Sequence, residues 1–321
     1  GAAIDASALH LGTLAAVEGG SVAGGPNGPA ATAATVRLAR LAVGPVAAVD
    51  VGARTLEVLG QTVQVDGSTV FDAALRGGLA AVRVGDVVSV HALADAGGHP
   101  LATRIEPAAA GEPWRLRGYV SAVDAGARRL SIGAATLDYA GAAAIPDGLA
   151  VGSFVQLRLA GTSAGGVFPV AAFVPVAAPA DAGRVEVEGL VAAPTAQGFR
   201  IGALAVDASA ATIVPGNAEL VAGAHAEVEG RLQAGTLVAD RVTLLAAQQA
   251  DRRSYRIAGT LTALDAPAQS FVVRGVGVDF SAANFVGGSA GSLVPGASVV
   301  QVVGPLSADG TQLRATQVLI R

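Results

Sequence analysis

Residues 184–230 read RVEVEGLVAAPTAQGFRIGALAVDASAATIVPGNAELVAGAHAEVEG. Four landmarks follow one another in this stretch: an apolar strand that reaches Gly189, a turn with Gly202, the pair Val206–Asp207, and Gly223 ahead of a further strand. The same landmarks recur in the same order through the rest of the chain. Self-similarity at a regular period is the mark of a repeat protein, so this stretch decides the fold.

Each landmark occurs in four copies. In chain order, the strand glycines are Gly44, Gly118, Gly189 and Gly259; the hairpin glycines are Gly60, Gly133, Gly202 and Gly275; the apolar-Asp pairs end in Asp66, Asp138, Asp207 and Asp279; and the later glycines are Gly85, Gly152, Gly223 and Gly296. We therefore predict four full repeats, at residues 41–110, 111–180, 181–250 and 251–321.

Residues 1–40 resemble only the second half of a repeat. LHLGTLAAVEGG around Gly12 is similar to VAGAHAEVEG, and ATAATVRLA at Ala31–Ala39 is similar to TLVADRVTLLA. There is no initiator Met. We expect this region to be the C-terminal half of a truncated repeat whose front half is missing.

Each repeat reads as about five short strands. In the first repeat, Leu56, Val58 and Val63 alternate with polar residues, which is the period of a half-buried strand. Gly60 sits between two such runs, where a tight hairpin needs positive φ. The strand glycines are expected to mark a bulge or bend at a barrel corner. We therefore predict an all-β chain of small five-stranded barrels, similar to the oligonucleotide/oligosaccharide-binding fold and arranged as beads on a string.

Composition bounds the classes of partner. The chain of 321 residues is 52% hydrophobic and 14% charged, with a formal net charge of −4, so it has no basic footprint for nucleic acid. It has no cysteine, which excludes disulfides and thiolate metal sites. The one long uncharged run, Leu159–Ala180, contains six Gly and Pro residues and coincides with expected strands. We therefore expect no transmembrane helix.

Several stretches resemble a known family. GPVAAVDVGARTLEVLGQTVQVDGSTVFD, followed by VGDVVSVHA and LATRIE, resembles the bacterial repeat catalogued as domain of unknown function 5666. RLRGYVSAVD and VEVEGLV resemble later copies in multi-repeat proteins of that family. The resemblance implies a secreted or lipid-anchored envelope protein built from small β-barrels. It implies no activity, and any lipid anchor would lie in the missing N-terminal part.

Aromatic side chains on second and third strands are the candidate ligand-binding residues. Barrels of this type stack bases or sugars on such rings. The candidates are Tyr139, Phe199, Phe271 and Phe280. Exposure of these rings would support binding of a polymer, whereas core or rim packing is the alternative. Trp114 and Tyr255, each four residues before a strand glycine, are expected to seal junctions between neighbouring barrels.

No catalytic, metal or cofactor site is predicted. The four histidines, His10, His91, His99 and His225, lack metal-ligand spacing and are interpreted as surface or strand-edge residues. GGSAG around Ser289 fits the nucleophile-elbow pattern but lies in an expected loop. The repeated aspartates are interpreted as turn caps.

The sequence thus favours a non-enzymatic, extracytoplasmic protein of the bacterial envelope that acts as a scaffold, spacer or interaction module. Its partner would be an envelope protein or polysaccharide. The alternative is a module that binds oligosaccharide or another polymer on an open barrel face. A hydrolase would require His225 to lie beside a carboxylate in a cleft.

Overall fold

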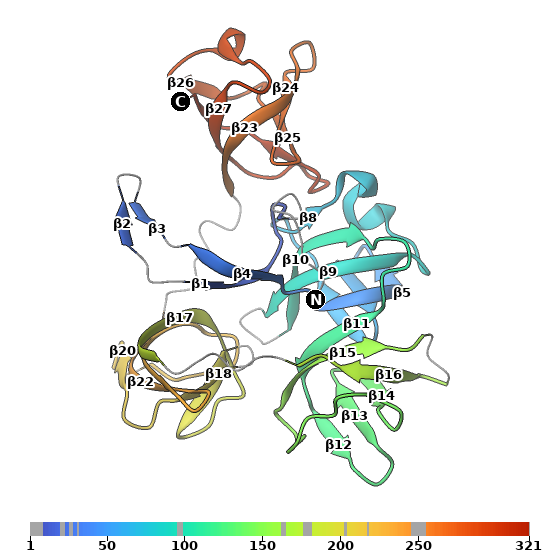
Figure 1. Ribbon diagram of the computed structural model, residues 1–321. Helices are drawn as coiled ribbons and strands as arrows, with labels where there is room; N and C mark the ends of the chain where they lie inside the picture. The colour runs from blue at the N-terminus through green and yellow to red at the C-terminus, as the bar shows by residue number, and fades with distance from the viewer. Residues whose placement is uncertain are drawn as a thin grey trace.

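The computed structural model describes residues 9–19, 23–25, 28–30, 32–94, 99–161, 165–175, 182–201, 204–216, 218–244 and 255–320. It is an all-β structure in which each of the four predicted repeats forms its own group of strands (Figure 1). No helix in this described part is long and apolar enough to cross a membrane.

The N-terminal region forms two small antiparallel sheets, β1 with β4 and β2 with β3. The strands are β1 (Ala15–Gly19), β2 (Ala23–Gly25), β3 (Gly28–Ala30) and β4 (Ala33–Leu38).

Repeat 1 contains six strands and two single-turn 3₁₀ helices. These are β5 (Ala42–Asp50), β6 (Thr55–Val58), β7 (Gln61–Gln64), β8 (Val70–Phe71), η2 (Ala73–Leu75), η3 (Gly78–Ala81), β9 (Val87–Ala94) and β10 (Pro100–Pro107). Hydrogen-bond pairing runs from β5 through β6, β7, β10 and β9 back to β5, which closes a ring.

Repeat 2 has the same order, but its first strand is divided in two. Its strands are β11 (Arg115–Tyr119), β12 (Ala122–Asp124), β13 (Arg129–Ile132), β14 (Ala135–Asp138), β15 (Phe154–Leu159) and β16 (Val167–Phe173). β11 pairs with β15, whereas β12 pairs with β13.

Repeat 3 is a closed five-stranded barrel in which β17, β18, β19, β22 and β21 pair in a ring. Its strands are β17 (Ala182–Ala192), β18 (Gly198–Ile201), β19 (Leu204–Asp207), β20 (Thr212–Val214), β21 (His225–Gln233) and β22 (Thr236–Leu244).

Repeat 4 forms a seven-stranded sheet. Its elements are β23 (Tyr255–Asp265), β24 (Ser270–Val273), β25 (Val276–Asp279), β26 (Asn284–Val286), η4 (Ala290–Ser292), β27 (Val299–Gly304), β28 (Gln312–Arg314) and β29 (Gln317–Ile320).

The strand glycines lie where the first strand of a repeat turns a corner, as the sequence predicts. β5 pairs with β9 through Pro45 and with β6 from Val46 onward, directly after Gly44. A Cβ on Gly44 would come within 2.7 Å of the Leu59 side chain. The counterpart Cβ atoms would come within 2.6 Å of Ile132 in repeat 2 and 2.5 Å of Ile201 in repeat 3. The glycine is therefore needed because a side chain from the second hairpin strand crosses the corner.

The repeated aspartates cap turns, which confirms the prediction. Asp66, Asp138, Asp207 and Asp279 each accept a hydrogen bond at Oδ1 from the backbone N–H two residues later, at 2.8–3.0 Å. This local bond holds the chain in a turn after the third strand. The hairpin glycines Gly60, Gly133 and Gly275 have φ values of 69°, 58° and 74°, whereas Gly202 lies outside the described residues.

Repeats 1 and 2 are not separate beads. β5 pairs with β11 at Ala42 and Val43, so the two repeats form one 12-stranded sheet. A single cluster of buried side chains runs through both, from Leu56 and Val90 in repeat 1 to Leu137 and Phe173 in repeat 2. Beads on a string is therefore wrong for this pair, because the edge of one first strand is covered by the next.

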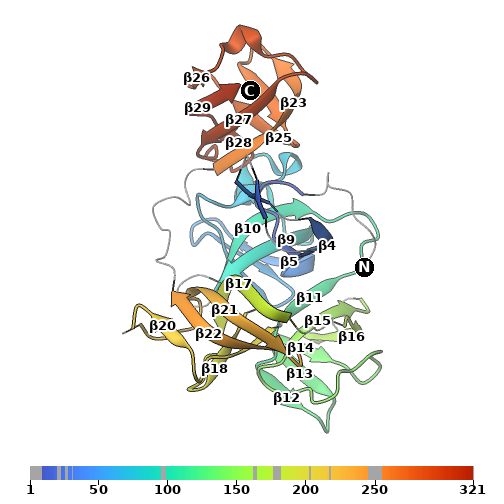
Figure 2. The ribbon, with the colours of Figure 1, turned by 60° about the vertical axis from the view of Figure 1, so that its left-hand side comes forward.

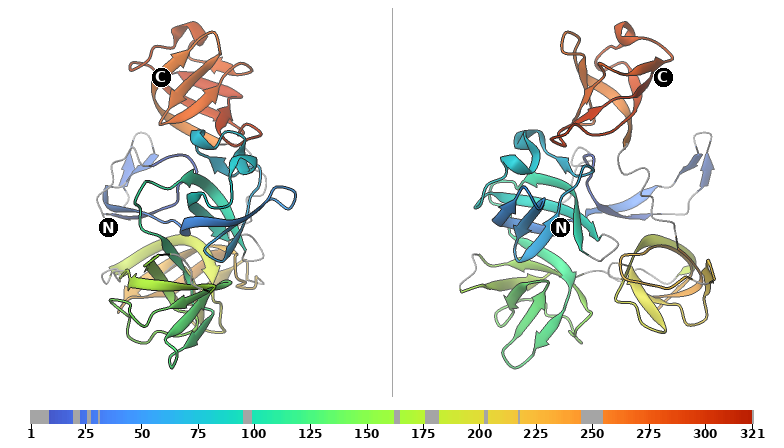
Figure 3. Two further views of the ribbon diagram at one scale, coloured as in Figure 1. Left: turned by 90° about the vertical axis from the view of Figure 1, so that its right-hand side faces the viewer. Right: turned by 180° about the vertical axis from the view of Figure 1, so that it is seen from behind.

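Repeat 4 lies against the end of repeat 1 that carries β8 (Figure 1), and the views in Figures 2 and 3 also place repeat 4 beside repeat 1. The N–H of Phe71 donates to the carbonyl of Gly310 at 2.9 Å. The Tyr255 hydroxyl donates to the carbonyl of Ser68. Tyr255 thus lies at a junction between repeats, but its partner is repeat 1, which is distant in sequence, whereas the sequence predicts a neighbouring unit.

Candidate functional site

A cluster of buried polar and charged side chains lies on the outward face of β9 and β10 in repeat 1. Strand alternation places Val88 and Val90 in the core and Ser89 and His91 on the opposite face. The register pairs His91 with Arg104 and Ser89 with Glu106, so all four share that face. His91 and Ser89 are no more than 1% exposed and Arg104 is 4% exposed.

Arg104 is the centre of the cluster. Its Nε donates to Glu106 Oε2 at 2.6 Å, and its Nη2 donates to Asp72 Oδ2 at 2.8 Å. Its Nη1 donates to the carbonyl of Leu11 at 3.3 Å. One buried guanidinium therefore joins two carboxylates of repeat 1 to the N-terminal segment. Such charge-assisted bonds are stronger than neutral ones.

His91 also binds the N-terminal segment. Its Nδ1 accepts the backbone N–H of Leu14 at 3.2 Å, which requires the neutral ring with its proton on Nε2. Nε2 lies 3.8 Å from Glu106 Oε1, longer than a hydrogen bond, and finds no hydrogen-bond partner among the described residues. Burial lowers the pKa of His91 below its usual value, against the opposing effect of Glu106.

Glu106 is held ionised in the same cluster. Burial by itself would raise its pKa, but the facing His91 ring and the Arg104 guanidinium lower the pKa to about 2. The described structure therefore contains a neutral histidine beside an ionised carboxylate. Together these side chains fix residues 11–14, and Thr103 Oγ1 adds a 2.7 Å bond to the carbonyl of Gly12.

We expect acidification to destabilise this part of the protein. The folded state favours neutral His91 and ionised Glu106, so the unfolded chain takes up protons first. Stability is lost as the pH falls from about 6.5 toward the lowered pKa of His91, and again from about 4.5 to 2 through Glu106. The loss from His91 is at most about 1.4 kcal/mol per pH unit. Urea unfolding at pH 7.5 and 5.5, followed by fluorescence of the single tryptophan Trp114, measures it.

The control is His91→Gln, which keeps an acceptor for Leu14 but does not titrate. This substitution should reduce the difference between the urea midpoints of unfolding at the two pH values. The same difference in both proteins would contradict a role for His91 in the pH dependence.

The cluster is particular to repeat 1. The core pair Val90–Ile105 corresponds in register to Leu157–Phe173, Val228–Val242 and Val302–Val318. One residue further on, His91 is replaced by Arg158, Glu229 and Val303, and Glu106 by Val174, Thr243 and Leu319. No other repeat therefore has this combination of histidine, arginine and glutamate at these positions.

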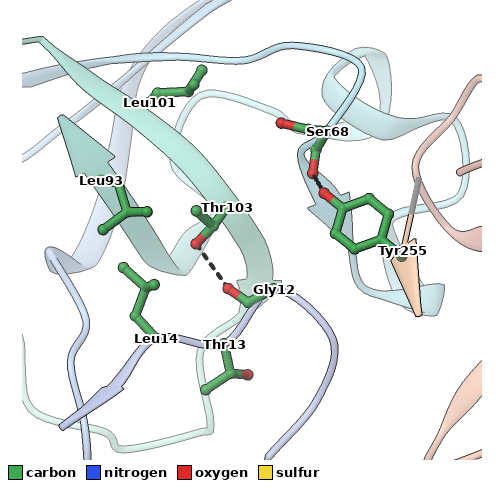
Figure 4. Close-up of a pocket in the computed structure, with 8 residues that line it drawn as sticks. All are labelled: Gly12, Thr13, Leu14, Ser68, Leu93, Leu101, Thr103 and Tyr255. Carbon is green, nitrogen blue, oxygen red and sulfur yellow. Dashed lines mark hydrogen bonds between the residues drawn. The ribbon is translucent and has the colours of Figure 1, made fainter. Parts of the chain in front are cut away.

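Two hollows flank the N-terminal segment where it crosses repeat 1. The first has a volume of about 230 Å³ and is mainly apolar (Figure 4). Leu14, Leu93 and Leu101 lie on one side of it, and Tyr255, bonded to Ser68, lies on the other. The second, of about 370 Å³, lies between repeats 1 and 4 and has Asp72, Arg76 and Arg104 on its repeat 1 wall. These hollows border a junction between parts of one chain.

The four candidate aromatic residues are buried and divided among three cores. Tyr139 packs edge-on to Phe173 in the core shared by repeats 1 and 2, and Phe199 lies in the core of repeat 3. Phe271 stacks on Phe280 at 5.4 Å in the core of repeat 4. All are at most 6% exposed. The predicted stacking surface is therefore wrong for these residues, since inward packing satisfies their large apolar area.

The other candidates differ in outcome. His91 is fully buried, so its interpretation as a surface residue is wrong, because the segment that covers it is remote in sequence. His225 begins β21 and is half-buried. Ser289 caps the short η4 helix and contacts Ser292, which is a loop setting as predicted. Among the residues that the structure describes, no group of three or more His, Asp or Glu could hold a metal ion.

Comparison with known proteins agrees with the repeat pattern. The sequence model of the family described as "Domain of unknown function (DUF5666)" matches residues 43–106, 184–243 and 258–318, more than half of the chain. The chain belongs to this family. The DUF5666 matches fall in repeats 1, 3 and 4, and repeat 2 has the same strand order without a match.

Other similarities are weak. The chain matches a solved structure described as "drosophila Unr CSD456" with 13% sequence identity, covering 64% of this chain and 96% of that one. The TM-score is 0.19, which does not establish a common fold. No curated protein matches the chain.

Proposed function

We propose that this DUF5666 protein is a non-enzymatic, extracytoplasmic scaffold or spacer of the bacterial envelope. In this proposal its repeats are tandem barrels similar to the oligonucleotide/oligosaccharide-binding fold. Their function is mechanical: rigid units hold a partner-binding surface at a fixed reach. The partner would be an envelope protein or polysaccharide.

The strand order supports the barrel proposal. In every repeat the third strand pairs in parallel with the fifth: β7 with β10, β14 with β16, β19 with β22, and β25 with β28. In repeat 4 the fifth strand is divided into β28, which pairs with the third strand, and β29, which pairs with the fourth. The fourth strand pairs antiparallel with the first and the fifth. A five-stranded Greek-key barrel has this arrangement.

The observation that carries the scaffold proposal is the joint between repeats 1 and 2. Besides the β5–β11 pairing, the two hairpins contact each other. The buried Gln61 amide donates to the carbonyl of Ile132 at 2.7 Å, and the N–H of Ala134 donates to the carbonyl of Gly60 at 3.1 Å. A shared sheet, a shared core and these bonds oppose hinge motion.

Burial of the aromatic candidates weighs against the alternative of polymer binding. Stacking of a base or sugar requires an accessible ring face. Tyr139, Phe199, Phe271 and Phe280 instead pack inside their cores. The described charged cluster also binds residues of the same chain.

A distance measurement tests the scaffold. The chain has no cysteine, so Val84→Cys and Val151→Cys can carry spin labels without background. These exposed valines precede Gly85 and Gly152 at equivalent places in repeats 1 and 2. Double electron–electron resonance should give one narrow distribution of distances between the two spin labels. Gln61→Ala should broaden it, whereas Gln64→Ala, a less buried position on the same strand, should not.

A broad distribution in the doubly labelled parent would contradict a rigid spacer. A saturable rise in melting temperature with one class of polysaccharide fragment would instead support a binding module. Fractionation of cells that produce the protein tests the extracytoplasmic location.

A further inference from the structure

The hairpin of β1 and β4 has the backbone geometry of the fourth and fifth strands of a repeat. Gly12, which precedes it, has a φ of 80°, and the later glycines Gly85, Gly152, Gly223 and Gly296 have φ values of 94°, 83°, 83° and 78°. β1 and β4 pair antiparallel, as the fourth and fifth strands do in each full repeat.

In the apolar pair of this hairpin, Val36 is half-buried and Val17 lacks the cover that its counterparts have. Val17, five residues after Gly12, pairs with Val36. The corresponding pairs are Val90–Ile105, Leu157–Phe173 and Val228–Val242, and every member is at most 4% exposed. Val17 is 63% exposed. A valine whose counterparts lie in buried cores therefore faces solvent.

Among the described residues, the backbone next to the hairpin also lacks one bond that its counterparts make. In each full repeat the N–H of the later glycine donates to the first strand, two residues after the strand glycine. These bonds run from Gly85 to Val46, Gly152 to Val120, Gly223 to Val191 and Gly296 to Leu261, at 2.7–2.9 Å. Among the described residues, the N–H of Gly12 makes no bond of this kind.

We propose that the β1–β4 hairpin is a docking surface for the front half of a DUF5666 repeat, namely its first three strands. The first strand of the added front half would pair along β1, and one of its backbone carbonyls would accept the N–H of Gly12. The third strand would pair in parallel with β4, and the apolar faces would bury Val17 and Val36. This is completion of a barrel by strand addition, in which main-chain bonds give affinity and alternate side chains give specificity.

The pairing within the four repeats favours a separate front half, and not a second copy of this chain, as the occupant. Every first strand in the described structure is already paired with the fourth strand of its own repeat. A second copy could supply a front half only by opening one of its own barrels, which would expose that core. A separate front half carries no such cost.

The test extends the full chain, ahead of Gly1, with a second copy of its own residues 41–84, the front half of repeat 1. Residues 1–10 then connect the copy to the hairpin. Hydrogen exchange should slow by a factor of about 100 at Ala15–Gly19 and Ala33–Leu38, because the strands gain partners and a core. Val17→Asp in the extended chain should restore fast exchange. Val84→Asp at the original position, an exposed valine outside the hairpin, should leave the protection unchanged.

Trp114 emission and the unfolding of repeats 1 and 2 verify that each variant folds. Exchange as fast in the extended chain as in the parent would overturn the proposal. A parent chain that is dimeric by light scattering, and that Val17→Asp makes monomeric, would also overturn it by showing that a second copy covers the hairpin.

Discussion

Replacing Arg104 by methionine is expected to lower the free energy of unfolding of repeats 1 and 2 by about 3–5 kcal/mol. Arg104 is almost fully buried and bonds to both Glu106 and Asp72. Methionine fills much of the same volume, so the main effect is electrostatic. Two carboxylates would lose their counterion, and the carbonyl of Leu11 would lose a donor. Removing one member of a buried ion pair leaves an uncompensated charge.

Trp114 makes the measurement specific. It is the only tryptophan, and it packs against the core that repeats 1 and 2 share. Urea unfolding followed by its emission therefore reports on that unit and not on repeats 3 and 4. Arg76→Met, an exposed position in the same repeat, is the matched control and should change stability by less than about 0.5 kcal/mol.

Neutralising the partners provides a second control. Arg104→Met combined with Glu106→Gln and Asp72→Asn should regain part of the lost stability, because no unpaired charge remains. If Arg104→Met alone costs less than about 1 kcal/mol, the cluster does not stabilise the junction with the N-terminal segment.

Replacing Gly118 by valine is expected to destabilise the same unit by about 3 kcal/mol. Gly118 is the strand glycine of repeat 2, and a Cβ there would lie 2.6 Å from Ile132 Cγ2. Ile132 is buried, and its carbonyl also accepts the Gln61 bond that joins the two repeats. The strand cannot relieve the overlap without disturbing that joint. Trp114 emission during urea unfolding again measures the effect.

A double-mutant cycle tests the cause. Gly118→Ala should cost about 1–3 kcal/mol, and Ile132→Ala should cost about 2–5 kcal/mol through the cavity that it creates. Because the second change removes the overlapping methyl group, the pair should cost less than the sum of the single changes, by about 1–2 kcal/mol. Gly141→Ala is the control, since a Cβ there meets nothing within 4 Å. Additive costs would refute the contact as the reason for the glycine.

The same contact explains why two landmarks recur together. Leu59, Ile132 and Ile201 each cross the strand glycine of their own repeat, and Arg274 does so in repeat 4. Each of these residues directly precedes the hairpin glycine. The two glycines thus recur together because one packing contact joins this part of the chain to the first strand in every repeat.

The sequence by itself determined the period, the strands, the hairpin glycines and the aspartate turns. These features depend on interactions within one repeat, over a few tens of residues. Asp66 caps its own turn, and Gly60 adopts the positive φ that its tight hairpin needs. Such local signals can be identified from the sequence, because each depends on residues that are close to it in the chain.

Only the tertiary structure decided what lies against each repeat. The alternation of β9 places His91 opposite the core, but its burial depends on Leu14, 77 residues earlier. Tyr139 and Phe280 directly follow a turn aspartate in sequence and were candidates for stacking, but they lie in cores in space. The joining of repeats 1 and 2 through β5 and β11, and the contact of Phe71 with Gly310, depend on surfaces of different repeats that meet in the folded chain. Such contacts depend on shape and charge across long separations, and no local pattern of residues encodes them.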